Sequence, residues 1–249
     1  METIFISAGF LAGALFFLSQ SLSKGVGSVG GALKQIGLFI LRKNPPGLVD
    51  IFDDRDGSGS RTWMNFGMLW LVFATLLGFL MGWHTYDPTA LDSLASVGWS
   101  YDDGSSLTDA TLNFLTIALL YGLIGSGMVA TARNGNGRLA SEANASMVAV
   151  LLSAVFLATY ILPFIFGFLD IDTEEGGVAI LLYSLETLAM GMLLIPVFIN
   201  LLITAANRGE QALQTSVWFL LIGVAAFILS MLYMFFGELA GATQTVWLA

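Results

Sequence analysis

The chain has 249 residues, of which 56% are hydrophobic and only 11% are charged, and its formal net charge is −9. Together with a mean hydropathy of +0.81, these values lie outside the range of soluble domains and indicate an integral membrane protein. The absence of cysteine excludes disulfides, thiolate metal sites and iron–sulfur clusters from this chain. The lone histidine, His84, excludes a bis-histidine haem or a three-histidine metal site, and the scattered basic residues do not suggest nucleic acid.

The first apolar stretch runs from Ile4 to Leu18 and carries Gly9 and Gly13 at a GxxxG spacing, which favours close helix packing. A secretory signal would need a basic segment before it and a small-residue cleavage site after it, and the sequence has neither. We therefore expect a transmembrane helix over residues 1–22.

Residues 23–62 are predicted to form a cytoplasmic connector. A short apolar run within it, Ile36 to Leu41, lies between basic residues and precedes Pro45. This pattern predicts a helix that lies in the membrane interface and ends before the proline.

The polar segment Val49–Arg61 contains an acidic run that invites comparison with a calcium-binding loop. Placing Gly57 at the sixth position of such a loop puts Phe52 at the first position and Trp63 at the twelfth, where acids are required. We expect a flexible, solvated loop instead of a calcium site.

Residues 63–249 are predicted to form a five-helix membrane bundle, because each apolar stretch meets the roughly 20 residues that a span requires. Pro163 and Pro196 lie inside two of these stretches. With the N-terminal helix, the fold is an all-α, polytopic helical bundle with about six transmembrane helices. The five predicted spans are Trp63–Trp83, Leu112–Ala132, Ala145–Leu169, Val178–Ala206 and Leu213–Leu239.

The basic residues predict the orientation in the cell membrane. All nine fall in the first, third and fifth connectors, which the positive-inside rule places in the cytoplasm, so both termini should lie outside. The second and fourth connectors are acidic and should form an extracellular face. The nine residues are Lys24, Lys34, Arg42, Lys43, Arg55, Arg61, Arg133, Arg138 and Arg208.

Glu186 is the one ionisable residue that the sequence places well inside a span, eight residues after Val178. Burying a carboxylate in a bilayer costs at least about 2.5 kcal/mol, so such residues face a partner or a cavity. Two roles fit: a hydrogen-bonding link between helices, or a step in a proton path. Polar groups at Asn113, Tyr121, Asn200 and Ser230 are further candidates for interhelical hydrogen bonds.

His84 lies at the outer end of its span, beside Trp83 and Tyr86. Aromatic residues of this kind gather at the membrane surface, so the three are predicted to be interfacial anchors. A haem-ligand role for His84 is disfavoured, because no second histidine exists to complete the pair.

Three stretches resemble the first half of the catalytic subunit of haem-copper terminal oxidases, in the branch that includes the cbb3-type enzymes. Leu115–Ser126 and the basic connector after it are similar to the family's second core helix, with its H-x5-F-G-x2-G-S pattern. Phe198–Phe219 is similar to the end of helix four and the start of helix five, and Met231–Leu239 to that helix's exit. The resemblance covers about Arg61 to Leu239.

The resemblance departs from the family at the haem ligand. With Tyr121 and Gly122 at the F-G position, the low-spin haem histidine falls on Leu115, which cannot ligate iron. The family's other haem and copper histidines belong to later helices. The resemblance therefore implies an electron-transport complex in which haem and copper are held by partner membrane subunits, and no cofactor, metal or catalytic residue is expected in this chain.

The sequence thus predicts a haem-free relative or partial form of an oxidase catalytic subunit, with a structural or assembly role. One alternative is a small multi-pass transporter or channel that uses Glu186 together with the two prolines. Another is a split gene whose second half supplies the missing histidines.

Overall fold

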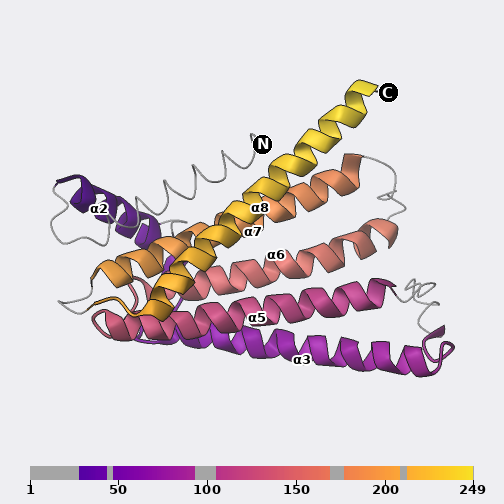
Figure 1. Cartoon of the computed structure of the whole chain (residues 1–249), viewed down its shortest axis with the longest axis horizontal. Helices are drawn as coiled ribbons and strands as arrows, with labels where there is room; N and C mark the ends of the chain where they lie inside the picture. Colours follow the sequence, from indigo (N-terminus) through magenta and orange to yellow (C-terminus); the bar gives the residue numbers. More distant parts are fainter. Residues whose placement is uncertain (1–27, 44–46, 93–104, 169–176, 208–211, 249) are drawn as a thin grey trace. The chain divides into compact units, whose positions relative to one another are not determined.

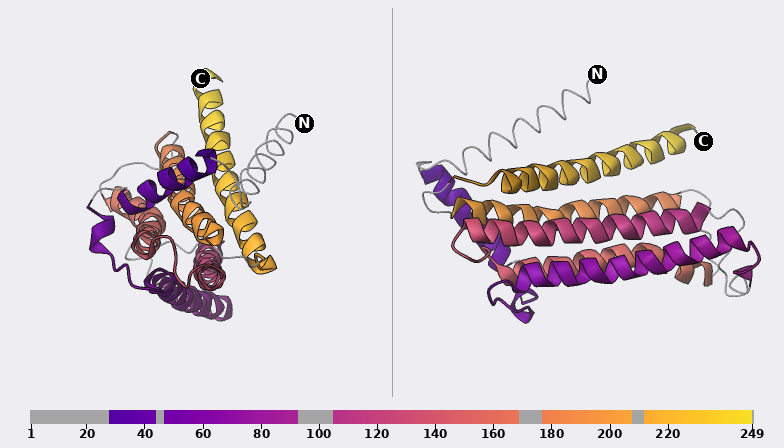
Figure 2. Two further views of the ribbon diagram at one scale, coloured as in Figure 1. Left: turned by 90° about the vertical axis from the view of Figure 1, so that its left-hand side faces the viewer. Right: turned by 60° about the horizontal axis from the view of Figure 1, so that its bottom comes forward.

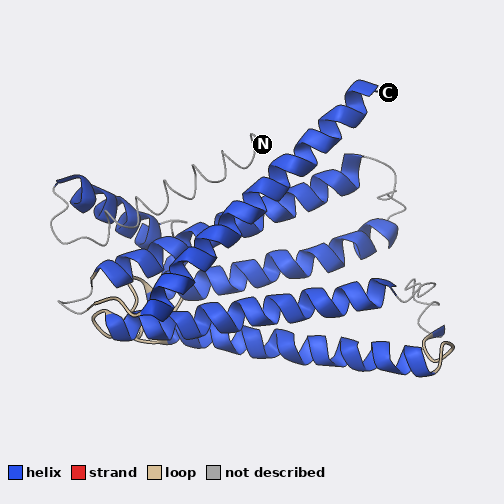
Figure 3. Cartoon of the chain, viewed as in Figure 1, coloured by secondary structure: helices blue, strands red, loops and turns tan. Residues whose placement is uncertain are grey.

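The computed structural model describes residues 28–43, 47–92, 105–168, 177–207 and 212–248. All regular structure in these ranges is helical, which confirms the predicted all-α class (Figures 1 and 3). The N-terminal helix expected over residues 1–22 lies outside the described residues. The elements are α2 (Ser28–Lys43), the 3-10 helix η1 (Val49–Ile51), α3 (Ser58–Tyr86), α5 (Ser105–Asn134), α6 (Glu142–Phe168), α7 (Gly177–Ala206) and α8 (Thr215–Leu248).

Five of these helices, α3 and α5 to α8, are long and apolar enough to cross a membrane. Their most apolar 18-residue windows have mean hydropathies of 1.8 to 2.5. The five spans predicted after residue 62 each fall on one of these helices, although α3 begins at Ser58 instead of Trp63. Helix α7 continues through Pro196 without ending.

The chain divides into two compact units. The smaller unit is Ser60–Ser126, which contains nearly all of α3 and nearly three-quarters of α5, from its start to Ser126. The larger unit combines Met1–Gly59 with Gly127–Ala249, and its described part contains α2, η1, the end of α5, and α6 to α8.

In the smaller unit, glycines let α3 and α5 approach closely. A Cβ atom added to Gly67 of α3 would lie 3.1 Å from the backbone nitrogen of Gly122, and one added to Gly125 of α5 would lie 3.2 Å from the backbone nitrogen of Met64. Both positions leave no room for a larger residue without a backbone shift. This is the small-residue packing typical of membrane helices, where close backbone contact replaces the hydrophobic effect.

Aromatic side chains fill the remaining space between these two helices. The Trp63 and Tyr121 rings are both fully buried, and their centroids lie 4.6 Å apart. Further along the pair, Trp70 meets Phe114 edge to face at 5.6 Å. Such ring contacts contribute about 0.5–1.5 kcal/mol beyond the burial of area.

In the larger unit, α7 is the central helix, because it packs against α6, α8 and α2 (Figures 1 and 2). At Gly191 an added Cβ would lie 3.2 Å from the Cβ of Met231 in α8. Near the C-terminal end of α7, an added Cβ on Gly37 of α2 would lie 2.8 Å from the side chain of Ile203. An alanine at either position would require the neighbouring side chain to shift.

Candidate functional site

The densest group of buried polar residues lies where α6 begins. Residues 141–146 are all buried, although four of the six are polar or charged. We call this group, together with its partners from other segments, the α6 junction. All of its members belong to the larger unit. They are Asp54, Ser141, Glu142, Asn144, Asn200 and Thr204.

Glu142 is the buried acid of the α6 junction, with only 1% of its surface exposed. Its Oε2 accepts a hydrogen bond from the backbone N–H of Gly59 at 2.9 Å, and its Oε1 accepts one from the N–H of Leu139 at 3.1 Å. Both oxygens of the carboxylate are therefore bound to backbone donors. Hydrogen bonds to a charged group contribute about 1.5–3 kcal/mol each, which offsets the cost of burying the acid.

Asp54 caps α6 from a distant part of the chain. Its Oδ1 accepts hydrogen bonds from the N–H groups of Glu142 at 3.0 Å and Ala143 at 3.2 Å, two of the donors that a helix leaves free at its start. Its Oδ2 forms an ion pair with Arg138 at 3.0 Å. A negative charge at a helix N-terminus is also favoured by the helix dipole.

Two side chains of α7 complete the junction. Asn200 accepts a hydrogen bond from the N–H of Ser141 at 3.2 Å and donates one to the carbonyl of the same residue at 2.6 Å. Thr204 accepts a hydrogen bond from the N–H of Ala140 at 2.9 Å. The interhelical role predicted for Asn200 is confirmed, since these bonds link α7 to the start of α6.

The prediction of a solvated loop over Val49–Arg61 holds for residues 53–56, which are exposed and not helical, but not for the two ends of the segment. The segment contains η1, a turn with Gly57 at φ +77°, and the first residues of α3. Asp54 binds the start of α6, and the Ser58 hydroxyl donates a hydrogen bond to the Asp53 carbonyl at 2.7 Å. The acidic run thus supplies a cap for the start of α6. Among the described residues, no three metal-binding side chains lie together.

The α6 junction is suited to holding helices together. Its bonded members bind mostly backbone N–H groups, which are fixed in place and do not exchange protons with a substrate. Asn144 is the exception, because its side-chain amide is fully buried and neither polar atom has a hydrogen-bond partner. Nothing in the described geometry explains the placement of this amide.

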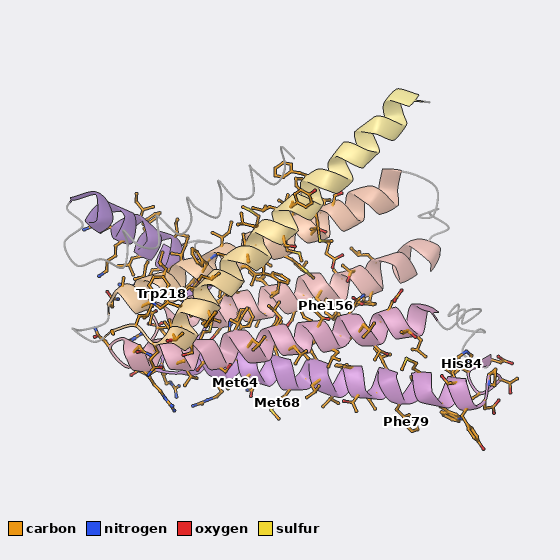
Figure 4. The ribbon with its side chains drawn as sticks, in the orientation of Figure 1. Met64, Met68, Phe79, His84, Phe156 and Trp218 are labelled. Atoms are coloured by element: carbon orange, nitrogen blue, oxygen red, sulfur yellow. The ribbon has the colours of Figure 1, made fainter. Side chains whose placement is uncertain are left out.

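The residues singled out from the sequence lie elsewhere. Glu186 is half-buried in α7 and interacts with at least one other group. Leu115 is 37% exposed on α5. His84 is half-buried near the C-terminal end of α3, while Trp83 and Tyr86 are exposed there (Figure 4). Their roles stay predictions.

Sequence reasoning missed Glu142, the most buried acid among those described, because it assigned this residue to a polar connector. One signal was present. Ser141 precedes an acidic first turn and a long apolar run, which is the pattern of a helix N-terminus, and the Ser141 hydroxyl does accept a hydrogen bond from the N–H of Asn144.

Comparisons with protein-family models, with curated proteins and with solved structures find nothing that matches this chain.

Proposed function

We propose that the chain is a non-catalytic, multi-pass membrane subunit that assembles with the cofactor-bearing subunits of a respiratory terminal oxidase. The observation that supports an assembly role is how little of two helices the chain itself covers. In both α3 and α8, only 17% of the most apolar window is buried, against 44–50% for the other three spans.

Helix α3 has the longest uncovered apolar face. Met64, Met68 and Phe79 are spaced along it and are all exposed (Figure 4). A face of this kind is covered in the membrane by lipid or by other helices. An assembly subunit would place its partner on this face.

The oxidase as partner rests on the sequence resemblance. Two of the residues that carry it, Tyr121 and Asn200, serve in packing here: the first stacks on Trp63 and the second binds Ser141. Position 115, where the family has its haem ligand, holds a leucine. A chain that retains the packing residues without the ligand fits a subunit that supports cofactor-bearing partners.

The test is to delete the gene in the source organism and to measure oxygen consumption and the haem spectrum of isolated membranes. We expect both to fall, and we expect the tagged wild-type chain to restore them and to migrate with the haem-stained complex in native gels. An unchanged haem content in the deletion strain, with the chain migrating separately, would refute the proposal.

A pair of substitutions locates the contact. Leu76→Trp adds bulk to the exposed face of α3, and Leu157→Trp adds the same bulk to an exposed position of α6. Lipid adapts to an added indole, whereas a packed partner helix does not. We expect only Leu76→Trp to release the chain from the complex.

A further inference from the structure

Helix α2 lies at the C-terminal end of α7 and is not one of the five helices able to cross a membrane. It is attached to α7 on one side: Gly37 is buried against Ile199 and Ile203, and Leu41, one turn later, is also fully buried. This leaves the rest of the helix surface free of contact with α7.

The free surface of α2 carries large apolar side chains. Ile36 is 56% exposed and Phe39 is 68% exposed, and the neighbouring η1 adds Ile51 at 76%. These exposed apolar side chains lie next to the membrane-spanning helices. An apolar environment outside the protein would therefore stabilise them. All of these residues belong to the larger unit.

The same helix is basic. Residues 28–43 contain three basic residues and no acid, and Lys34 and Arg42 are exposed. At about 100° per residue, Ile36, Phe39 and Ile40 fall within one arc of about 100°, and Lys34 lies nearly opposite Ile36. Arg42 lies at the edge of this arc, about 60° from Phe39, and Lys43, at the end of the helix, falls within it. An apolar arc bordered by basic residues, in a helix too short to span, is typical of a helix that lies in the headgroup region of an anionic membrane.

We infer that α2 is a lipid-recognition element: it inserts Ile36 and Phe39 into the bilayer surface and binds anionic phospholipid headgroups through Lys34 and Arg42. Charge complementarity selects this ligand, because basic residues next to a membrane attract anionic lipid by about 1 kcal/mol each. In the segment that follows α2, Asp53 pairs with Arg55, and Asp54 and Asp56 pair with Arg138, while Asp50 of η1 is exposed. The inference does not depend on the oxidase proposal.

The experiment uses the absence of cysteine, which makes single-site labelling direct. Phe39→Cys in the full chain is labelled with an environment-sensitive fluorophore and placed in nanodiscs of phosphatidylcholine with increasing phosphatidylglycerol. We expect a blue shift and quenching by spin-labelled lipid as the anionic fraction rises. The matched control, Asn136→Cys, is an exposed turn position and should report water throughout.

Removing one charge tests the headgroup contact. Arg42→Gln in the Phe39→Cys background should move the half-maximal response to a roughly fivefold higher anionic fraction, as the loss of one basic residue at the surface predicts. Arg133→Gln, which removes an exposed charge from α5, should leave the response unchanged.

Three outcomes would overturn the inference. A label at position 39 that reports water in every nanodisc shows that the apolar arc does not insert. Insertion that is equal with and without phosphatidylglycerol shows that headgroup charge is not recognised. Shielding that appears only when partner subunits are added assigns the surface to a protein.

Discussion

Glu142 is the buried acid on which the start of α6 depends, because its two oxygens accept hydrogen bonds from different parts of the chain. Glu142→Gln keeps only one acceptor oxygen, so one buried N–H loses its partner. We expect the free energy of unfolding to fall by about 1–3 kcal/mol, and Glu142→Leu to cost more because it removes both acceptors. Thermal unfolding in lipid nanodiscs measures this. Equal melting temperatures for Glu142→Leu and wild type would contradict the role.

Substitutions of Glu186 distinguish an interhelical hydrogen-bonding role from a role in proton transport. If it links helices, Glu186→Gln preserves assembly, and Glu186→Leu loses interhelical bonds worth about 0.6 kcal/mol on average and up to about 1.7. If it carries protons, Gln leaves the fold intact and abolishes activity, because an amide does not release a proton at neutral pH. Assembly and proton-coupled oxygen consumption are measured for both variants. We expect the first pattern; an assembled but inactive Glu186→Gln would favour the second.

The two acids also show what a sequence reveals about single residues. Glu186 is conspicuous because hydrophobic residues surround it in the chain. Glu142 is not, because it stands beside polar residues, and its burial is produced by Gly59, 83 positions earlier. Hydropathy along the chain detects an acid within an apolar stretch, such as Glu186. It does not detect an acid that is buried by a distant segment, such as Glu142.

At the scale of helices, the first residues of α3 pack against the first residues of α6 at Gly59. Nothing in the sequence around this glycine predicts the contact. An added Cβ on Gly59 would lie 2.7 Å from the Cβ of Ala145 and 3.1 Å from the carbonyl oxygen of Glu142. We expect Gly59→Ala to destabilise the protein by about 1–3 kcal/mol, as overpacking does. Gly82→Ala in α3 is the matched control, since nothing lies within 4 Å of its added Cβ. Similar melting temperatures for the two variants would contradict the close packing at Gly59.

The orientation of the helices is tested by cysteine labelling. Asn136→Cys, in an exposed turn between α5 and α6, should react only with reagent on the cytoplasmic side, and the exposed Asp92→Cys only from outside. Gly135 is a poorer site, because an added Cβ would lie 3.0 Å from the carbonyl oxygen of Thr204. Labelling of both cysteines from one side would overturn the predicted topology.

The sequence predicts which segments form the long helices, but it does not predict the residue at which α3 begins. Span length and hydropathy depend only on the bilayer, so all five long helices were found. The start of α3 at Ser58 depends instead on the turn at Gly57 and on the Asp53 carbonyl, and Asp54 binds the start of α6, 88 positions later. These are tertiary contacts, which local composition does not encode.

For the molecule as a whole, the main expectation concerns haem. Purified alone, the chain should show no Soret absorbance, because His84 is its one histidine and the proposed resemblance to the oxidases puts Leu115 at the position of the haem ligand. Leu115→His should not create a normal low-spin site, since one imidazole provides half of the axial coordination. A stoichiometric six-coordinate haem spectrum that disappears in His84→Ala would refute this expectation.

The division into two units was not predicted from the sequence, which indicates one bundle over residues 63–249. The boundaries at Gly59 and Ser126 fall inside α3 and α5. Periodicity and hydropathy do not change at these points, so they give no sign of the boundary. Only the pattern of packing between helices distinguishes the units.

The bonds at the α6 junction impose an order on biosynthesis. When α6 leaves the ribosome, Asp54 and Gly59 already exist and their bonds to the start of the helix are free to form. Thr204, which accepts from the N–H of Ala140, is 64 residues further along the chain. At about 5–20 residues per second, translation reaches it roughly 3–13 s later. During that interval α6 is anchored only to the part of the protein made before it, and the synthesis of α7 completes the attachment.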